Sequence, residues 1–270
     1  MKSGLAICLV LVGCAPAVPV RPAVKPMRVV SLDYCADQYV LKLLPAARIA
    51  AVSPDARAEF SYMRGAAAGV PQVRASAEDV LLLRPDMVVR SYGGGPNVAP
   101  LLARAGVPVL QLGYAEDLAG VKRVLIEAAD GLGEHAAGAA MAAEIDARVA
   151  KLAKASAARS ALYVTPGGVT TGPGSLVDAM MRAAGLRNFQ TQAGWAPLPL
   201  ERLAYAKPDV VAAAFFDTRW NRADPWSATA HPVARAAFRG RPTAALPGAW
   251  TACGGWFVLD AVEAMAKVAR

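Results

Sequence analysis

Residues 78–89 read EDVLLLRPDMVV, and residues 201–211 read ERLAYAKPDVV. Each stretch has a glutamate, five further residues, a basic residue, the pair Pro-Asp and then an apolar run. Because the residue before a proline disfavours the α region, each proline predicts the end of a helix, and the aspartate that follows predicts a turn into a strand. The two stretches therefore predict that the chain consists of two similar halves.

Short apolar runs alternate with helical stretches along the whole chain. Predicted strands lie at residues 28–32, 49–52, 87–89, 107–112, 161–164, 210–216 and 243–246. Predicted helices lie at residues 37–44, 77–83, 98–105, 176–184, 200–206 and 258–268. Continuous apolar strands separated by helices are typical of parallel sheets that are buried on both faces. The predicted fold class is α/β, with two Rossmann-like lobes.

The middle of the chain predicts a connection between the lobes. Residues 117–157 contain no proline and are interrupted by Gly131-Leu132-Gly133. From residue 134 to residue 157 nearly every residue favours a helix, and such a helix would be about 36 Å long at 1.5 Å per residue. The predicted organisation is a signal peptide at 1–13, a proline-rich tether at 14–26, an N-terminal lobe at 27–116, a connecting helical segment at 117–157 and a C-terminal lobe at 158–270.

The N-terminus predicts export. Met1-Lys2 is followed by an apolar run from Leu5 to Val12, which is too short to span a bilayer and is typical of a signal peptide. Residues 11–14 resemble a bacterial lipobox, in which Cys14 would be acylated; the alternative is an ordinary secretory peptide cut at residues 15–17. We expect the protein in the periplasm or cell envelope, in contact with the membrane only through this lipid anchor.

Signal removal and acylation would leave two cysteines, Cys35 and Cys253, in an oxidising compartment. Three alternatives stay open: a disulfide, two inert buried thiols near the cleft, or direct ligation of iron or cobalt. The sequence does not give the distance between the two Cα atoms, which decides whether a disulfide can form.

Composition and motifs exclude several classes of function. Hydrophobic residues make up 55% of the chain and charged residues 19%, which is typical of a folded protein rather than a disordered one. The net charge is +8, but the basic residues are scattered along the chain. Proteins that bind nucleic acid normally have a concentrated basic patch, so this distribution argues against nucleic-acid binding. The chain lacks a Gly-x-Ser-x-Gly elbow and the phosphate-binding glycine motifs, and its 2 histidines are too few for a metal site built on imidazoles. We expect no catalysis, no metal and no cofactor.

Five short segments carry a resemblance to a known family. They are residues 28–32 (RVVSL), 78–89, 106–109 (GVPV), 131–134 (GLGE) and 184–188 (AGLRN). In this order the chain resembles the periplasmic substrate-binding proteins of ABC importers for iron complexes and cobalamin, the class III proteins whose two lobes are joined by one long helix. The resemblance implies capture of an iron complex or a corrinoid and its delivery to a membrane permease by a monomer. The alternatives are an exported ligand-sensing domain and, with less support, an exported enzyme on the same fold.

The resemblance also assigns a role to the two glutamates of the repeat. Glu78 and Glu201 match the surface glutamates with which such proteins dock on arginines of the permease. The alternative is local, because an acid in the first turn of a helix is already favoured by the helix dipole.

Ligands of open parallel sheets bind beyond the carboxyl ends of the strands. The corresponding loops are rich in aromatic residues and contain several arginines. This combination suits a large, flat, partly anionic ligand such as a ferric siderophore, a haem or a corrinoid, because rings stack and guanidinium groups pair with carboxylates. About half of the aromatic residues are expected to face the core instead. The candidate ligand-binding residues are Tyr34, Tyr62, Arg64, Arg90, Tyr92, Trp195, Arg219, Trp220 and Trp250.

Overall fold

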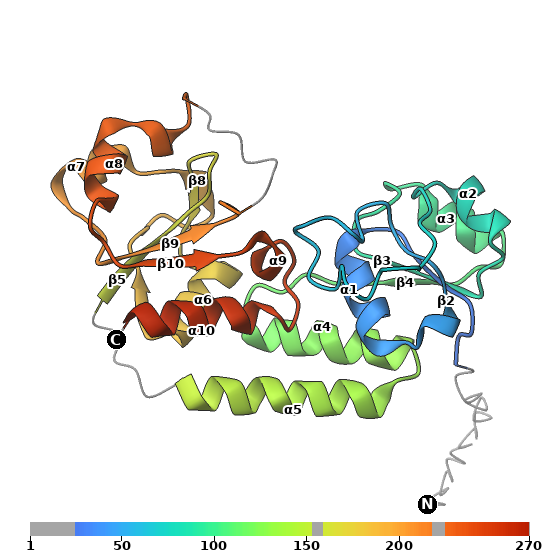
Figure 1. The fold of residues 1–270 in the computed structure, drawn as a ribbon. Coiled ribbons are helices and arrows are strands. Elements are labelled where there is room, and N and C mark those ends of the chain that lie inside the picture. The colour runs from blue at the N-terminus through green and yellow to red at the C-terminus, as the bar shows by residue number, and fades with distance from the viewer. Residues whose placement is uncertain (1–24, 153–158, 218–224, 270) are drawn as a thin grey trace, which may run out of the picture.

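A computed structural model describes residues 25–152, 159–217 and 225–269. These residues form two α/β lobes above a pair of helices (Figure 1). The predicted fold class is therefore confirmed. The predicted signal peptide, the acylated Cys14 and most of the tether lie outside the described residues.

Both lobes contain a four-stranded parallel sheet with the same topology. The N-terminal sheet has the order β2-β1-β3-β4, and the C-terminal sheet has the order β10-β9-β5-β7. In each sheet the first strand along the chain lies between the second and the third, and the fourth follows the third. The strands are β1 (Val29–Ser31), β2 (Ile49–Ala51), β3 (Met87–Arg90), β4 (Val109–Gln111), β5 (Arg159–Val164), β7 (Leu186–Asn188), β9 (Val210–Ala214) and β10 (Thr243–Leu246). The two halves predicted from the repeat are thus similar in topology.

Helices cover both faces of each sheet. The helices of the N-terminal lobe are α1 (Tyr34–Leu43), α2 (Ala77–Leu82) and α3 (Val98–Arg104). Those of the C-terminal lobe are α6 (Leu176–Ala183), α7 (Leu200–Tyr205), α8 (Pro232–Phe238), α9 (Gly248–Thr251) and α10 (Val258–Ala269). A separate two-stranded antiparallel sheet pairs β6 (Val169–Thr171) with β8 (Trp195–Pro197). The sequence analysis missed β6, β7 and β8, because their sequences, VTT, LRN and WAP, are not continuous apolar runs.

The Pro-Asp pairs of the repeat have the same role in both lobes. Asp86 accepts hydrogen bonds from the backbone N–H groups of Met27 (2.7 Å) and Arg28 (2.9 Å), just before the first strand of its sheet. Asp209 accepts from the backbone N–H (2.7 Å) and the hydroxyl (2.8 Å) of Ser160, in the equivalent strand. These hydrogen bonds hold the pKa of Asp209 below its usual value. Each aspartate therefore joins the third strand of a lobe to the first.

The connection between the lobes consists of two antiparallel helices, α4 (Leu118–Gly131) and α5 (His135–Leu152). The predicted helix at 134–157 begins where it was expected, and its last five residues lie outside the described part of the chain. The 18 residues of α5 span about 27 Å. The glycines at 131 and 133 end α4 and allow the reversal, and Gly133 has a φ of +73°.

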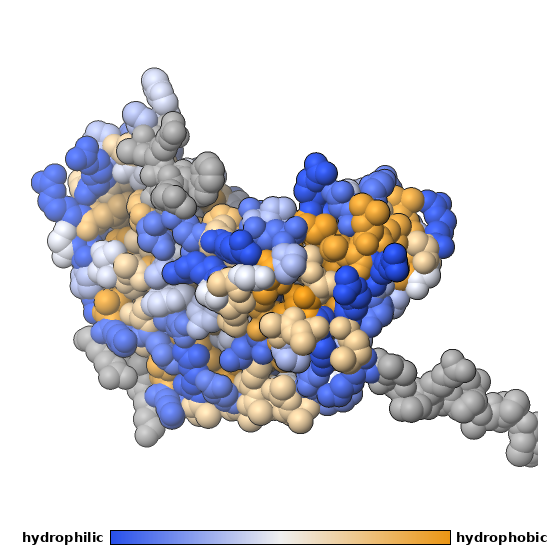
Figure 2. Space-filling view, turned by 45° about the vertical axis from the view of Figure 1, so that its right-hand side comes forward, coloured by the Kyte–Doolittle hydropathy of each residue, from blue (hydrophilic) through white to orange (hydrophobic). Residues whose placement is uncertain are grey.

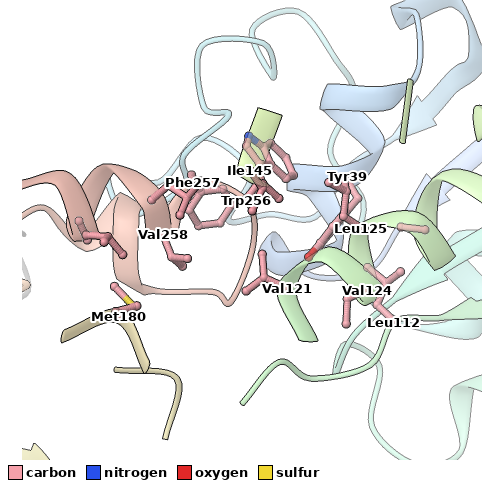
Figure 3. Close-up of a cluster of buried hydrophobic side chains, with 14 of the residues drawn as sticks. Tyr39, Leu112, Val121, Val124, Leu125, Ile145, Met180, Trp256, Phe257 and Val258 are labelled. Carbon is pink, nitrogen blue, oxygen red and sulfur yellow. The ribbon is translucent and has the colours of Figure 1, made fainter. Parts of the chain in front are cut away.

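One hydrophobic cluster runs through both lobes and the connecting helices. Figure 3 shows Tyr39 of α1, Trp256 and Phe257 beside α10, and Leu125 of α4 converging on the same region. The rings of Tyr39 and Trp256 meet edge to face at 5.5 Å, across the boundary between the lobes. Two smaller clusters fill the outer faces of the two sheets. Because the lobes share a core at their base, we expect them to move little relative to one another.

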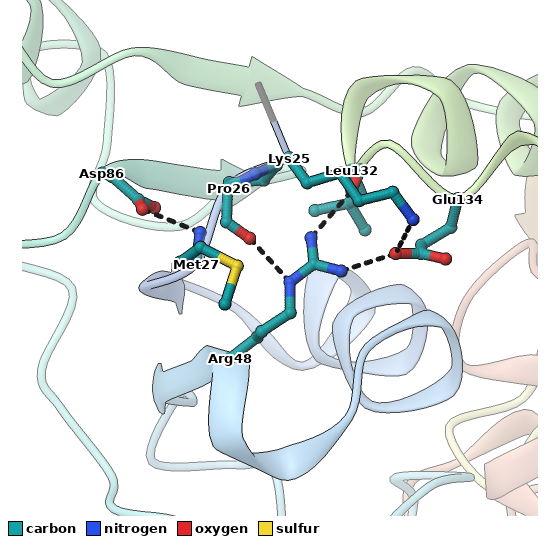
Figure 4. A network of polar contacts seen from close by, with 7 residues as sticks. All are labelled: Lys25, Pro26, Met27, Arg48, Asp86, Leu132 and Glu134. Atoms are coloured by element: carbon teal, nitrogen blue, oxygen red, sulfur yellow. Dashed lines mark hydrogen bonds and ion pairs between the residues drawn. The ribbon is translucent and has the colours of Figure 1, made fainter. Parts of the chain in front are cut away.

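A polar network fixes the start of the described chain (Figure 4). The buried guanidinium of Arg48 donates to the carbonyl oxygens of Pro26 (2.7 Å) and Leu132 (3.0 Å) and pairs with the carboxylate of Glu134. Lys25 pairs with the same carboxylate at 3.2 Å. The pKa of Glu134 is lowered, first by the hydrogen bond from Arg48. The chain therefore enters the N-terminal lobe beside the turn between α4 and α5.

Within the described residues, none of the helices combines the length and the hydropathy needed to cross a membrane.

The buried carboxyl of Asp37 in α1 predicts a pH-dependent stability. Burial raises the pKa of Asp37 from 3.8 to about 6, although its oxygens accept hydrogen bonds from the backbone N–H (3.0 Å) and hydroxyl (2.6 Å) of Ser53. Since the folded state holds this proton more tightly than the unfolded chain, the stability that the group contributes is present below about pH 4 and is lost as the pH rises through about 6. We therefore expect the free energy of unfolding of Asp37→Asn, relative to that of the unchanged protein, to increase by up to about 3 kcal/mol between about pH 4 and pH 7. Urea unfolding of both proteins at the two pH values measures this difference. A difference that is the same at both pH values would contradict the prediction.

Candidate functional site

A pocket of about 460 Å³ lies between the two lobes. Figure 2 shows the molecule hollowed between the lobes on its upper side. The N-terminal lobe contributes the loop at residues 59–65, and the C-terminal lobe contributes the ends of the segments that follow β9 and β10. The lining residues are Glu59, Tyr62, Arg64, Gly65, Asp217, Pro247, Ala249 and Trp250. The predicted residues Tyr62, Arg64 and Trp250 are brought together here, although Trp250 lies more than 180 positions from the other two along the chain.

Buried polar side chains of α1 hold the loop that carries Tyr62. The side chain of Gln38 donates to the Ser61 hydroxyl at 3.0 Å and accepts from the backbone N–H of Met63 at 2.7 Å. Asp37 holds Ser53 at the start of the same loop. Since these polar groups are buried and satisfied, the loop has a fixed place beside the pocket.

Tyr62 crosses from the N-terminal lobe to the C-terminal lobe. Its ring stacks on Phe257 at 4.6 Å, and its hydroxyl donates to Asp260 at 2.9 Å. The other oxygen of Asp260 accepts from Arg148 of α5 at 2.7 Å. Burial, together with the Asp260 carboxylate, raises the pKa of Tyr62 to about 12. At physiological pH this side chain therefore offers a neutral ring rather than a phenolate.

Tyr34 and Tyr92 follow two strand ends of the N-terminal lobe and lie beside the pocket, outside its lining. The Tyr34 ring meets Phe60, in the loop that lines the pocket, edge to face at 4.9 Å, and we call this region the floor of the cleft. The rings of Tyr34 and Tyr92 are 5.8 Å apart, and the Tyr34 hydroxyl donates to the carbonyl of Ala252 in the other lobe at 3.3 Å. Burial is the main cause that raises the pKa of both phenols. Tyr92 keeps 45% of its surface exposed. Tyr92 therefore combines an exposed ring with a neutral hydroxyl, whereas Tyr34 is part-buried and its hydroxyl is engaged with the other lobe.

Asp33 positions both tyrosines, and the sequence analysis did not include it in the site. One oxygen of its buried carboxylate caps α1 at the backbone N–H of Ala36 (2.9 Å). The other accepts from the N–H groups of Ser91 (2.7 Å), Tyr92 (3.1 Å) and Gly93 (2.9 Å). A Cβ at Gly93 would lie 2.4 Å from the Leu32 carbonyl oxygen, so this turn requires a glycine. The signal available in the sequence was an aspartate immediately before a helix.

Cys35 and Cys253 form a disulfide between the lobes. Their Cα atoms are 5.6 Å apart, and 218 positions separate them along the chain. This pairing decides among the three alternatives left open by the sequence. Cys35 follows Tyr34 in the first turn of α1, and Cys253 follows α9, which carries Trp250.

The C-terminal wall depends on the short helix α9. The carboxylate of Asp217 accepts from the backbone N–H of Gly248 at 2.9 Å and so fixes the beginning of α9. Trp250 then lies part-buried at the pocket. Trp195 is not among the residues that line the pocket; it lies on β8 of the two-stranded sheet, 62% exposed, with its ring edge to face with Tyr163.

The arginines predicted to bind the ligand have different positions. Arg64 is exposed at the pocket. Arg90 is buried, and its guanidinium donates to the carbonyl oxygens of Gly95 (2.9 Å) and Tyr92 (3.3 Å). We therefore assign Arg90 to holding the loop after β3 rather than to contact with a ligand. Arg219 and Trp220 lie outside the described residues.

Glu78 and Glu201 occupy equivalent places on the surface. Each is exposed in the first turn of its helix, α2 or α7, and both helices lie on the upper side of the molecule in Figure 1. Among the described residues neither carboxylate has an ion-pair partner. Four positions further along lie two large apolar residues, Leu82 and Tyr205, which are 80% and 94% exposed. Figure 2 shows hydrophobic side chains gathered on the upper part of the N-terminal lobe.

The described residues contain no group of three or more histidine, cysteine or acidic side chains arranged to hold a metal ion. The chemistry of the cleft is therefore that of aromatic faces, neutral hydroxyls and a few charges.

A family model described as periplasmic binding protein matches residues 29–219. The chain belongs to this family. Its type is a substrate-binding protein, and the family implies a periplasmic location. None of the curated sequences matches the chain.

Three solved structures illustrate the fold that this binding protein shares. The periplasmic heme-binding protein BhuT in complex with two hemes is 24% identical with a TM-score of 0.72, covering 90% of this chain and 99% of its own. The periplasmic heme-binding protein HutB of Vibrio cholerae is 18% identical with a TM-score of 0.75, covering 89% and 98%. The periplasmic vitamin B12-binding protein BtuF of Vibrio cholerae is 17% identical with a TM-score of 0.65, covering 91% and 97%. At these identities the likeness concerns the fold.

Proposed function

We propose that this protein is the extracytoplasmic solute-binding component of an ABC importer and that it captures an iron complex or a corrinoid in the cleft between its lobes. The observation that carries the proposal is the pocket to which both lobes contribute aromatic side chains, Tyr62 and Trp250, in a chain of the periplasmic binding protein family. Proteins of similar fold include a periplasmic heme-binding protein, a periplasmic vitamin B12-binding protein and a protein of an ABC-type Fe3+-hydroxamate transport system.

The chemistry of the pocket supports a ligand with a broad, flat surface. The neutral ring of Tyr62 and the indole of Trp250 can bind such a surface by stacking, with little loss of side-chain entropy. Arg64 offers one cation to a carboxylate of the ligand, whereas Glu59 and Asp217 make the remainder of the lining partly acidic. Shape and stacking therefore contribute more to recognition than net charge does.

Equilibrium titration of the purified protein tests the proposal. Hemin, cyanocobalamin and ferrichrome serve as probes, and quenching of tryptophan fluorescence is the readout. We expect saturable binding of one probe with 1:1 or 2:1 stoichiometry and a Kd in the micromolar range or below. Absence of saturable binding by all three probes would overturn the proposed ligand class.

Trp250→Ala gives the first prediction for this site. Removing the indole deletes one wall of the pocket, and aromatic anchors of this kind contribute about 2 kcal/mol or more. We expect the Kd of the probe that binds to rise roughly 30-fold. Ile126→Ala, at an exposed apolar position on α4 away from the pocket, is the matched control and should leave the Kd unchanged. An unaltered Kd in the Trp250 variant would place the ligand elsewhere.

Delivery requires a surface that recognises the membrane permease. We propose that Glu78 and Glu201 dock on basic residues of the permease, one from each lobe, with Leu82 and Tyr205 as apolar contacts beside them. Four features support this: the matched positions in the repeat, the exposure of all four residues, the lack of an ion-pair partner among the described residues, and their place on the same side as the cleft. Docking as a monomer would bring both lobes to the permease at once.

The lipid anchor is part of the same proposal and has its own test. If Cys14 is acylated, Cys14→Ser should move the protein from the membrane fraction to the soluble periplasmic fraction, because each buried CH₂ of an acyl chain contributes about 0.8 kcal/mol to membrane binding. Immunoblots of separated fractions measure the distribution. Cys8→Ser, inside the predicted signal peptide, is the control that should leave the distribution as it is. A Cys14 variant that remains in the membrane fraction would argue against the anchor.

A further inference from the structure

The disulfide joins a helix of the N-terminal lobe to a short connecting segment of the C-terminal lobe. Cys35 belongs to α1, in which the N-cap and the buried side chains of Asp37 and Gln38 are hydrogen-bonded. Cys253 lies in the segment 252–255, between the four-residue helix α9 and α10. The disulfide therefore joins the hydrogen-bonded first turn of α1 to the short segment 252–255.

The segment 252–255 is short and rich in glycine. It contains Gly254 and Gly255, and glycine loses more conformational freedom on folding than any other residue. A Cβ at Gly255 would lie 2.5 Å from the ring of Phe257, so a larger residue does not fit there. Backbone hydrogen bonds from Ala252 to Gly248 (2.8 Å) and from Gly255 to Cys253 (3.0 Å) hold the segment internally. The disulfide and the hydrogen bond from the Tyr34 hydroxyl to the Ala252 carbonyl join it to α1.

Association of the lobes does not depend on this bond. The shared hydrophobic cluster, the contact between Tyr39 and Trp256, and the chain of hydrogen bonds from Tyr62 through Asp260 to Arg148 already join the lobes at their base. The disulfide adds a constraint nearer the floor of the cleft, one residue from Tyr34 and three from Trp250. Its particular effect is therefore on the distance and orientation between these two aromatic side chains.

We propose that the Cys35–Cys253 disulfide is a positioning cross-link of the binding site: it holds Tyr34 and Trp250 in register across the cleft, so that ligand affinity depends on the oxidation state of this pair. The inference rests on the proposed function, because it concerns the same cleft. Reduction requires a dithiol as the electron donor. Two electrons and two protons pass from the dithiol to the protein, the S–S bond breaks, Cys35 and Cys253 become thiols, and the donor becomes a disulfide. Both cysteines are part-buried rather than fully buried, which leaves the bond open to such a donor.

Hydrogen exchange tests the cross-link without any ligand. The oxidised protein is compared with Cys35→Ser/Cys253→Ser, and also with protein that has been reduced with dithiothreitol and desalted under nitrogen. We expect faster amide exchange in residues 31–37 and 248–256 of both altered forms, with unchanged exchange in β3 and β9, which lie in the sheets. Unchanged exchange in the two cleft segments would overturn the proposal. The reduced natural chain keeps the test valid if the serine variant folds poorly.

Ligand binding provides the second readout. For the probe that the oxidised protein binds, among hemin, cyanocobalamin and ferrichrome, we expect the Kd to rise roughly tenfold or more in both altered forms, mainly through a faster dissociation rate. Reoxidation of the reduced natural chain should restore the original Kd, and dithiothreitol treatment should leave the serine variant unaffected. Equal affinity of oxidised and reduced protein would overturn the proposal. If the oxidised protein binds none of the probes, the proposed ligand class fails, while hydrogen exchange still decides whether the cross-link positions the cleft.

Discussion

Cys35→Ser/Cys253→Ser is expected to lower the free energy of unfolding by about 5 kcal/mol, the entropy of closing a loop of 218 residues in the unfolded chain. For a protein of this size the melting temperature should fall by roughly 10 °C or more. Differential scanning calorimetry of the oxidised protein and the double variant measures the change. The large effect follows from the position of the bond, because the cross-link connects residues near opposite ends of the folded chain.

The reductant provides the control for this expectation. Dithiothreitol should lower the melting temperature of the unchanged protein to nearly that of the double variant, and it should leave the double variant as it is. If the unchanged protein and the variant melt at the same temperature in the absence of reductant, the disulfide does not contribute to stability in solution.

Reversing both docking glutamates should abolish most transport while ligand binding persists. In Glu78→Arg/Glu201→Arg, like charges would meet the basic surface of the permease, a juxtaposition that costs several kcal/mol, whereas the loss of a helix-dipole contact costs about 0.3 to 1 kcal/mol. We therefore expect uptake of the identified ligand to fall by at least 100-fold at limiting protein concentration. Uptake by cells that carry the variant is measured beside the Kd of the purified variant.

A second charge reversal of the same size separates docking from net charge. Glu127→Arg/Glu144→Arg alters two exposed acids of α4 and α5, away from α2 and α7, and it should leave uptake unchanged. Normal uptake by the Glu78/Glu201 variant would mean that the two glutamates do not dock on the permease and only stabilise the first turns of their own helices. A loss of ligand binding in solution would mean that α2 and α7 lie nearer to the binding site than the structure places them.

The repeat and the alternation of apolar runs were sufficient to predict the fold. The block from Glu78 to Val89 and its counterpart from Glu201 to Val211 determine where helices end and strands begin, and this depends on local chemistry of proline and aspartate. The apolar run of β9 predicted a buried strand by its composition alone. In contrast, β6 and β8 pair because residues 169–171 and 195–197 meet in space, and no local pattern marks such a pairing.

The candidate site was predictable in part. Tyr62 and Trp250 were identified because they follow predicted strands, and the topology brings such loops to one edge of each sheet. Arg90 was assigned to the ligand for the same reason, but its guanidinium turns inward to the carbonyl oxygens of its own loop, which sequence position does not indicate. Asp33 was missed because three of its four backbone partners lie in the loop after β3, about 60 positions further along the chain. The pairing of Cys35 with Cys253 depended on a distance of 5.6 Å that only the folded chain determines.

A structure of the oxidised protein with the bound ligand tests the central claim most directly. The ligand that the titration identifies should lie between the two lobes, in contact with Tyr62 from the loop at 59–65 and with Trp250 from α9. The disulfide should be intact on the floor of the cleft beneath the ligand. A ligand bound on the surface of one lobe, or beside Tyr114 and Arg123 at the start of α4, would contradict this account.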